Sequence, residues 1–374
     1  MLKPIRFALQ VSLLAIVWLA ILHVAGTAQA AMVAGFASCG TAATPGATAT
    51  STGSGGDHGT PVPAGSAVLR LAADVPMPGG ASRFDYQSLD PTTGRLYIAH
   101  MGVGQLVVFD TKHRAVVATV ADLPMVTGVL AVPALGHVYA AVAGDHRVDV
   151  VDNQSLKVID RLGTIGFPDG LDYAPQAKRV FVSDGSGSGE VVIDASTDKV
   201  LTTIDIGGEA GNTHYDAGSG CILVTVKSRN QLAAIDPTSN QVVGRFDLGG
   251  GCQGPHGFAL DAQARLAFIT CEDNAKLVVV NLVSAQVTAS FPVGNGRDVL
   301  AFDPGWERLY VAAESGLVAV FAEDDGALDP IGQLSIPHAH SVAVDPTTHL
   351  VYFPLENIDG HPVLRIMTPT PPRA

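Results

Sequence analysis

The chain has 374 residues, with 35 acidic and 22 basic side chains, so its formal net charge is −13. Such an acidic surface repels phosphate backbones, which excludes nucleic acid as an expected partner. The 41 glycines and 23 prolines mark many turns, and no stretch after Gly65 keeps a helical period, which favours an all-β domain. The sequence contains no phosphate-loop, dinucleotide-binding or Gly-x-Ser-x-Gly pattern, so it carries no signature of those enzyme classes.

Residues 1–30 are typical of an export signal. Lys3 and Arg6 precede an apolar run over residues 7–22, and residues 28–30 read Ala-Gln-Ala, a small-x-small cleavage site. Two alternatives stay open, namely an uncleaved membrane anchor and a lipid-anchored Cys39, because the Phe-Ala-Ser-Cys stretch ending there resembles a bacterial lipobox. In each case we expect an exported protein, periplasmic or extracellular, whose only membrane contact would be such an N-terminal anchor.

Residues 31–66 consist largely of Gly, Ser, Thr, Ala and Pro with almost no charge. Such a composition cannot bury a core, and it predicts a flexible tether. The folded domain is therefore expected over residues 67–369, followed by a short tail at 370–374.

A strand with an apolar or aromatic pair recurs through this domain. Its seven copies are Leu96-Tyr97, Val138-Tyr139, Val180-Phe181, Ile222-Leu223, Ala267-Phe268, Leu309-Tyr310 and Val351-Tyr352. Their second residues, here called the landmark positions, are spaced by 42, 42, 42, 45, 42 and 42 residues. A period near 42 with four short strands per unit is typical of the blades of a β-propeller.

The last unit, His340 to Met367, has room for only three strands. The missing fourth strand is supplied by residues 67–75 (AVLRLAADV) at the other end of the domain. Pairing it into the last blade closes the ring and removes an open sheet edge. The sequence thus predicts a seven-bladed β-propeller of four-stranded blades, with the N-terminal strand closing the last blade.

The four cysteines favour different interpretations. Cys221 begins a second strand, where a small buried hydrophobe is the simpler reading. Cys252 lies in the loop before a first strand and Cys271 ends the following strand, so the hairpin brings them toward the same end. In an oxidising compartment we expect a disulfide between them, contributing about 3 kcal/mol through loop entropy.

Polar residues gather on one face of the predicted ring. Because adjacent strands are antiparallel, the start of each first strand and the end of each second strand lie on the same face. Twelve residues before each landmark stand Asp85, Thr127, Asp169, Gly211, His256, Asp298 and His340, here called the ring positions. Just past the second strands stand His100, Asp184, Lys227, Glu272, Glu314 and Glu356.

These residues have a structural and a functional interpretation. The structural interpretation is that each polar side chain caps a turn or solvates the channel mouth. The functional interpretation is that four adjacent blades together hold one divalent metal ion, through His256, Asp298, His340 and Asp85. Glu272, Glu314 or Glu356 would then orient the metal ligands or serve as acid/base groups. His338 could join this arc, whereas His214 should point away from it and serve the structure.

At the level of its repeats, the chain resembles the bacterial YVTN-repeat seven-bladed propellers. The segments that carry the resemblance are PHGFALD at 255–261, HSVAVDP at 340–346, LYIAH at 96–100, LYVAA at 309–313 and FITCEDN at 268–274. The literal Tyr-Val-Thr-Asn tetrapeptide is absent, and FITC comes nearest to it. The resemblance implies an exported propeller that binds something on its loop face.

Two functions remain open. The first is a binding or scaffold module that presents an acidic, His-containing loop face to a small molecule, a metal or a protein. The alternative is a metal-dependent hydrolase or lyase that uses the His/Asp arc at the channel mouth. A redox role is less well supported, because the sequence has no Cys-x-x-Cys-His haem site. The sequence alone does not decide whether the protein is an enzyme.

Overall fold

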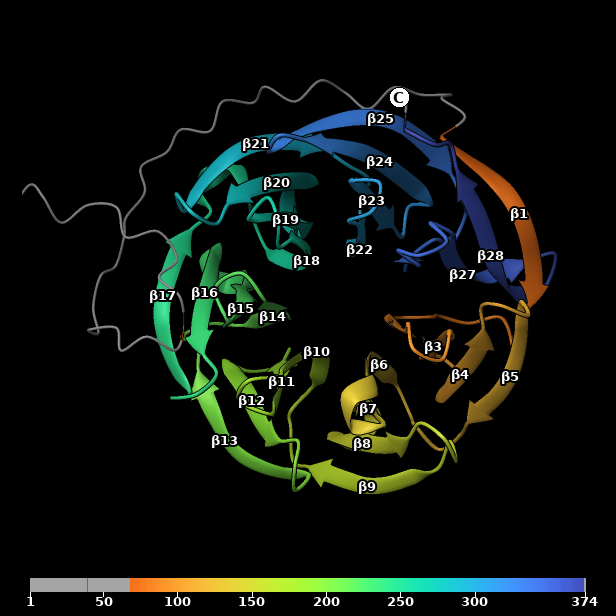
Figure 1. The fold of residues 1–374 in the computed structure, drawn as a ribbon, viewed down its shortest axis with the longest axis horizontal. Coiled ribbons are helices and arrows are strands. Elements are labelled where there is room, and N and C mark those ends of the chain that lie inside the picture. The colour runs from red at the N-terminus through yellow and green to blue at the C-terminus, as the bar shows by residue number, and fades with distance from the viewer. Residues whose placement is uncertain (1–38, 40–67, 373–374) are drawn as a thin grey trace, which may run out of the picture. The chain divides into compact units, whose positions relative to one another are not determined.

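The computed structural model describes Cys39 and residues 68–372, apart from the side chains of Arg297 and Asp298. The predicted export signal at residues 1–30, and the predicted tether except Cys39, lie outside the described residues. The described residues form seven four-stranded antiparallel sheets arranged in a ring (Figure 1). None of their helices is long and apolar enough to cross a membrane.

The first three blades follow one another along the chain. Blade 1 contains β2 (Gln87–Asp90), β3 (Arg95–His100), β4 (Gln105–Asp110) and β5 (Ala115–Val120). Blade 2 contains β6 (Val126–Val132), β7 (His137–Val142), β8 (Arg147–Asp152) and β9 (Val158–Gly163). Blade 3 contains β10 (Pro168–Ala174), β11 (Arg179–Asp184), β12 (Gly189–Asp194) and β13 (Lys199–Asp205).

The next three blades repeat this order. Blade 4 contains β14 (Ala210–Asp216), β15 (Cys221–Val226), β16 (Gln231–Asp236) and β17 (Gln241–Asp247). Blade 5 contains β18 (Pro255–Asp261), β19 (Leu266–Cys271), β20 (Lys276–Asn281) and β21 (Gln286–Pro292). Blade 6 contains β22 (Arg297–Asp303), β23 (Arg308–Ala313), β24 (Leu317–Asp324) and β25 (Ala327–Ser335). Short 3-10 turns are η1 (Pro133–Leu135), η2 (Ala143–Asp145), η3 (Lys227–Arg229), η4 (Gly249–Gly251) and η5 (Glu272–Asn274).

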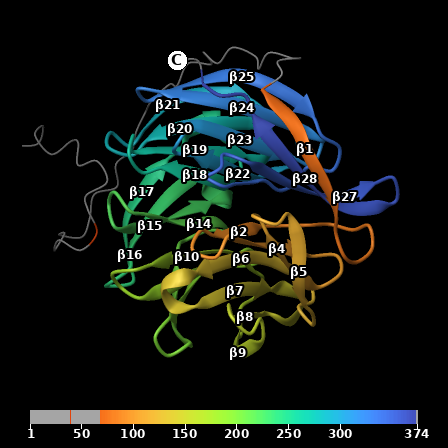
Figure 2. The same ribbon diagram turned by 45° about the vertical axis from the view of Figure 1, so that its right-hand side comes forward.

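Blade 7 closes the ring with strands from both ends of the domain. Its order is β1 (Leu69–Pro76), β28 (His361–Pro369), β27 (Val351–Ile358) and β26 (Ala343–Val344). β1 pairs antiparallel with β28 from Leu69 opposite Pro369 to Pro76 opposite Val363, and both lie side by side at the rim in Figures 1 and 2. The predicted seven blades and the predicted closure by the N-terminal strand are therefore confirmed.

The core lies between neighbouring blades. The second and third strands are apolar on both faces, as in β3 and β4, so each sheet can pack against the blades on either side. Tyr97 of β3, for example, is fully buried in a cluster that also contains Val138 and Ala140 of β7. The landmark aromatic residues therefore recur because each fills the space between two blades.

Two disulfides lie on opposite faces of the ring. We call the face where first strands begin and second strands end the mouth face, and there Cys252 is bonded to Cys271. Cys221 begins a second strand on the opposite face and is bonded to Cys39. The interpretation of Cys221 as a simple buried hydrophobe was therefore wrong.

The Cys39–Cys221 bond also bears on the N-terminal alternatives. A lipobox cysteine carries its lipid on sulfur, so lipidation of Cys39 and the Cys39–Cys221 disulfide are mutually exclusive. Its backbone N–H also donates to the carbonyl of Ser219 at 2.8 Å. Cys39 is thus fastened to blade 4, whereas the sequence placed it within a free tether.

Candidate functional site

The ring positions stand where the first strands begin, and the strands are bulged there. In β6, β10, β14, β18 and β22 the ring residue is the second of the strand, and it lies within a shift of the pairing register between the first and the fourth residues. A β-bulge leaves a residue outside the regular ladder and changes the direction of its side chain. Asp85 and His340 occupy the corresponding places just before β2 and β26. This local irregularity directs polar side chains toward the mouth of the channel.

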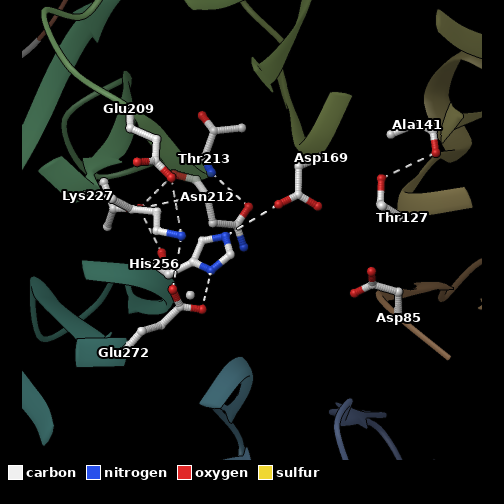
Figure 3. A network of polar contacts seen from close by, with 12 residues as sticks. Asp85, Thr127, Ala141, Asp169, Glu209, Asn212, Thr213, Lys227, His256 and Glu272 are labelled. Carbon is white, nitrogen blue, oxygen red and sulfur yellow. Dashed lines mark hydrogen bonds and ion pairs between the residues drawn. The ribbon is translucent and has the colours of Figure 1, made fainter. Parts of the chain in front are cut away.

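His256 is held between two carboxylates that come from different blades. Its Nδ1 lies 2.8 Å from Oε1 of Glu272, which follows β19 of the same blade. Its Nε2 lies 3.3 Å from Oδ2 of Asp169 in blade 3 (Figure 3). Only a protonated imidazole has two N–H donors, so both contacts are strongest when this ring is protonated.

Blade 4 lies between the two blades that this histidine connects. Its ring position is Gly211, and a Cβ built there would come 2.4 Å from Oγ1 of Thr225 and 3.1 Å from Cα of His256. Thr225 Oγ1 in turn donates to the carbonyl of His256 at 2.7 Å. A side chain at residue 211 would therefore displace the groups that position His256, which explains why a glycine stands there.

Lysine and a further glutamate extend this arrangement. Nζ of Lys227, in η3 of blade 4, lies 3.0 Å from Oε2 of Glu272 and 3.5 Å from Oε1 of Glu209. We call Asp169, Glu209, Lys227, His256 and Glu272 the His256 cluster; it joins three blades through alternating charges. Burial alone would raise the pKa of Glu272, but the His256 hydrogen bond and charge, together with Lys227, lower that pKa to about 2.

A second group forms around His340 of blade 7. Its Nδ1 lies 3.3 Å from Oε1 of Glu314 in blade 6, and its Nε2 lies 3.5 Å from Oδ1 of Asp85. Nη2 of Arg83 lies 2.9 Å from the same Nε2. We call Arg83, Asp85, Glu314 and His340 the His340 cluster. The side chains of Asp85 and His340 are each only 5% exposed.

Arginine makes this second cluster electrostatically different from the first. A guanidinium has only donors, so Nε2 of His340 accepts a hydrogen bond from Arg83, which requires that nitrogen to be unprotonated. The hydrogen bond from His340 outweighs the opposing effect of burial and, with the Arg83 charge, lowers the pKa of Glu314 to about 2. The two mouth histidines are thus held in different hydrogen-bonding states.

The remaining predicted face residues have structural partners. His100 is fully buried, stacks on Phe84 with ring centroids 3.9 Å apart, and lies 3.1 Å from Oγ of Ser82; burial lowers its pKa. The carboxylate of Asp184 accepts the backbone N–H of Phe167 at 2.8 Å and caps that loop.

Thr127, Glu356 and His214 also contact other residues of the propeller. Thr127 donates to the carbonyl of Pro168 at 2.8 Å and so connects blades 2 and 3. Oε2 of Glu356 lies 3.9 Å from Nδ1 of His338, apart from both clusters. His214 lies 3.3 Å from Asp172 and packs edge-on against Phe258, in agreement with a structural role.

The four residues expected to hold a metal belong to separate groups. His256 lies in one cluster, His340 and Asp85 lie in the other, and the Asp298 side chain is outside the described residues. Among the side chains that are described, no three or more His, Cys, Asp or Glu residues form a group that could hold a metal ion. The metal arc stays a prediction.

Sequence reasoning did not identify Arg83 or Glu209 as members of the site. Arg83 stands two residues before a ring position, and Glu209 two residues before another, so the same offset from Asp85 and Gly211 could have found both. That signal is weak, because loop residues before a strand are polar in most proteins.

A shallow groove of about 530 Å³ lies beside the His256 cluster on the mouth face. Its walls are the loops before β12 and β14 and the η3 turn, formed by Gly185, Ser186, Gly187, Ser188, Asp205, Gly207, Gly208, Glu209 and Arg229. Glu209 belongs both to this groove and to the His256 cluster, so the two are continuous.

Comparison with known proteins identifies the fold, but neither a family nor a function. No family model matches the chain, and no curated protein matches its sequence. Among solved structures, hydrazine synthase from Kuenenia stuttgartiensis superposes with a TM-score of 0.66 at 15% identity, covering 80% of this chain and 97% of that chain. In all, 1743 solved chains match, so this architecture is widespread and does not select a function. The chain is an all-β protein with the seven-bladed β-propeller fold.

Proposed function

We propose that the protein is an exported binding module whose channel mouth takes a small ligand carrying a positive charge. The observation that supports this most is that four carboxylates, Asp169, Glu272, Asp85 and Glu314, lie within 3.5 Å of the imidazole nitrogens of His256 and His340 at the mouth. Three of these four contacts join side chains from different blades, so the site is preorganised by the ring itself. Preorganised polar groups at a concave mouth are typical of small-molecule sites.

The charge of the mouth favours a cation. Within the two clusters, five carboxylates face two permanently basic side chains, Arg83 and Lys227; the carboxylates are Asp85, Asp169, Glu209, Glu272 and Glu314. Glu272 and Glu314 stay ionised far below neutral pH, because the pKa of each is about 2. A concave site with excess negative charge raises the local concentration of cations.

The same pKa values favour binding over acid/base catalysis. A general acid or base works best when its pKa lies near the operating pH. Glu272 and Glu314 were candidates for moving protons, and with a pKa of about 2 each is a weak base at neutral pH. Their contacts with the histidines instead suit groups that hold an electrostatic framework in place.

The test is calorimetric titration of the full chain, exported to a periplasm and purified without chelator or His tag. The probes are Zn²⁺, Mn²⁺, Ca²⁺, putrescine and arginine. We expect at least one to bind, and Asp85→Asn or Asp169→Asn to weaken that binding about tenfold, the effect of losing about 1.4 kcal/mol. Asp160→Asn on outer strand β9 is the matched control and should leave binding unchanged. If no probe binds, or if the mouth variants bind like the control, the proposal is wrong.

A second candidate is a metal-dependent hydrolase or lyase. It is favoured by one observation: two of the glutamates considered as acid/base groups, Glu272 and Glu314, contact the two histidines considered as metal ligands. Elemental analysis of the same preparation tests it. About one equivalent of a transition metal, lost in the His256→Ala/His340→Ala double variant, supports this candidate; a metal-free folded protein contradicts it.

The location and the family are part of the proposal. Two disulfides in one chain are typical of proteins in oxidising compartments, which supports export to the periplasm or the medium. The strand segments quoted above support a relationship to YVTN-repeat propellers. Fractionation of expressing cells tests the location, since a cytoplasmic protein with reduced cysteines would contradict it.

A further inference from the structure

The boundary between blades 3 and 4 departs from the repeat in its interior. The second residue of the third strand pairs with the second strand at an equivalent place in six blades: Leu106, Val148, Glu190, Leu232, Leu277 and Val318. All six are fully buried. Glu190 is thus an acid at a position where the other blades place leucine or valine.

One neighbouring position departs from the repeat in the same direction. Thr213 of β14 occupies the first-strand position that is Val129, Leu171, Phe258 and Leu300 in other blades. Ser183 of β11 is paired directly with Glu190. We call Ser183, Glu190 and Thr213 the blade 3–4 seam; these three polar side chains are fully buried, and they come from β11, β12 and β14 (Figure 1).

Glu190 has no charged partner in this seam. Among described residues it forms no ion pair, its nearest polar neighbours are the hydroxyls of Thr213 and Ser183, and neither of its oxygens meets a partner in hydrogen-bonding geometry. Three ionisable groups on the adjoining strands are engaged elsewhere. Asp184 of β11 caps the loop at Phe167, Asp205 of β13 accepts the N–H of Gly207, and His214 of β14 faces Asp172.

An ionised carboxylate without a partner is costly inside a protein, so a buried acid of this kind keeps its proton. We propose that Glu190 is an uncharged acid in the folded protein and makes the blade 3–4 seam sensitive to pH, so that the seam loosens as pH rises through the neutral range. Burial raises the pKa of Glu190 to about 8, against the smaller opposing effects of Thr213 and Ser183.

The coupling between proton binding and folding determines whether stability rises or falls with pH. A folded-state pKa above the unfolded value stabilises the fold at low pH, and that contribution is lost as pH rises toward the folded pKa. For Glu190 the loss therefore develops from the ordinary carboxyl range near 4.5 up to about 8. The strands of the seam begin directly after residues that wall the groove, Ser188 before β12 and Glu209 before β14. Loosening of the seam would therefore change the groove.

The test compares the full chain with Glu190→Gln, which keeps the shape and cannot ionise, and with Glu190→Leu, the residue that other blades use. Thermal unfolding is followed from about pH 6 to about pH 9, the range in which the carboxyl would lose its proton. We expect the wild-type midpoint to fall relative to both variants as pH rises. Glu307→Gln, an exposed carboxyl of blade 6, is the matched control and should follow the wild type.

Hydrogen exchange measured by mass spectrometry locates the effect. The exchange rates are first corrected for intrinsic base catalysis. The equilibrium constant for opening of β12 and β14 should then increase by up to about tenfold per pH unit between roughly pH 6 and pH 8. The increase should be absent from both Glu190 variants, and β4 in blade 1 should not show it. Parallel midpoints for wild type and variants, or an equal increase in β4, would overturn the proposal. Neither readout depends on a ligand, so this result is separable from the proposed function.

Discussion

Gly211 is the residue on which the geometry of the His256 cluster depends. Every other described ring position carries a side chain, whereas a Cβ at residue 211 would crowd the backbone of His256, whose Cα would lie 3.1 Å away. A built Cβ would meet Oγ1 of Thr225 at 2.4 Å and the carbonyl of Pro255 at 3.0 Å. The absence of a side chain here is therefore as important to the cluster as the histidine itself.

We expect Gly211→Ala to destabilise the fold by about 1–3 kcal/mol, because overpacking displaces Thr225 and the backbone of the neighbouring blade. Urea unfolding measures the loss. Gly250→Ala is the matched control, since a Cβ there has nothing within 4 Å. Equal unfolding midpoints for the two variants would contradict this account of Gly211.

At this scale the sequence predicts positions better than contacts. The 42-residue period located His256, His340 and Asp85 at the mouth, because strand starts repeat regularly. It could not show that the histidines fall into two clusters, which depends on how far each side chain reaches across the channel. It also placed His100 on the ligand face, whereas that ring turns inward and stacks on Phe84.

β1 is the element that completes the ring. It covers the outer edge of β28 from Leu69 to Pro76, and Asp74 adds an ion pair to Arg365 of β28 at 2.6 Å. Without β1, the backbone N–H and C=O groups of β28 would form an open edge, which readily pairs with other chains.

Removal of residues 69–76 should therefore cause association, because two copies can pair through the uncovered β28 edges. Size-exclusion chromatography with light scattering measures the change. Removal of residues 371–374, which lie beyond β28, is the control and should leave a protein of unchanged mass distribution. A truncated protein that stays monodisperse and folded would show that the closure is dispensable.

The strands were largely predictable because their apolar runs recur with the blade period. The closing strand was expected at 67–75 and is β1 at Leu69–Pro76. The innermost strand of blade 7 was less predictable: β26 contains only Ala343 and Val344, whereas the first strands of blades 2 to 6 have seven residues each.

At the scale of the whole molecule, the two disulfides enclose very different lengths of chain. Cys252–Cys271 closes a separation of 19 residues and Cys39–Cys221 one of 182. The first could be expected because a hairpin brings its cysteines together. The second could not, because nothing local in the sequence connects a low-complexity segment with blade 4.

Loop entropy predicts which bond stabilises more. The longer loop should contribute about 5 kcal/mol and the shorter about 3 kcal/mol. Guanidinium unfolding of Cys39→Ser/Cys221→Ser and of Cys252→Ser/Cys271→Ser checks this, and each double variant serves as the control for the other. A larger loss in the short-loop variant would contradict the ordering.

The position of Cys39 also decides how the molecule would carry mechanical load. The disulfide joins it to Cys221 on the face opposite the mouth, whereas the backbone itself continues from Cys39 to β1. A pulling force applied through residues that precede Cys39 would enter blade 4 through the sulfur bridge and bypass the strand that closes the ring. β1 would otherwise peel from β28 one hydrogen bond at a time. With the bridge intact, a molecule pulled through its N-terminal segment could bear the load without opening its own ring.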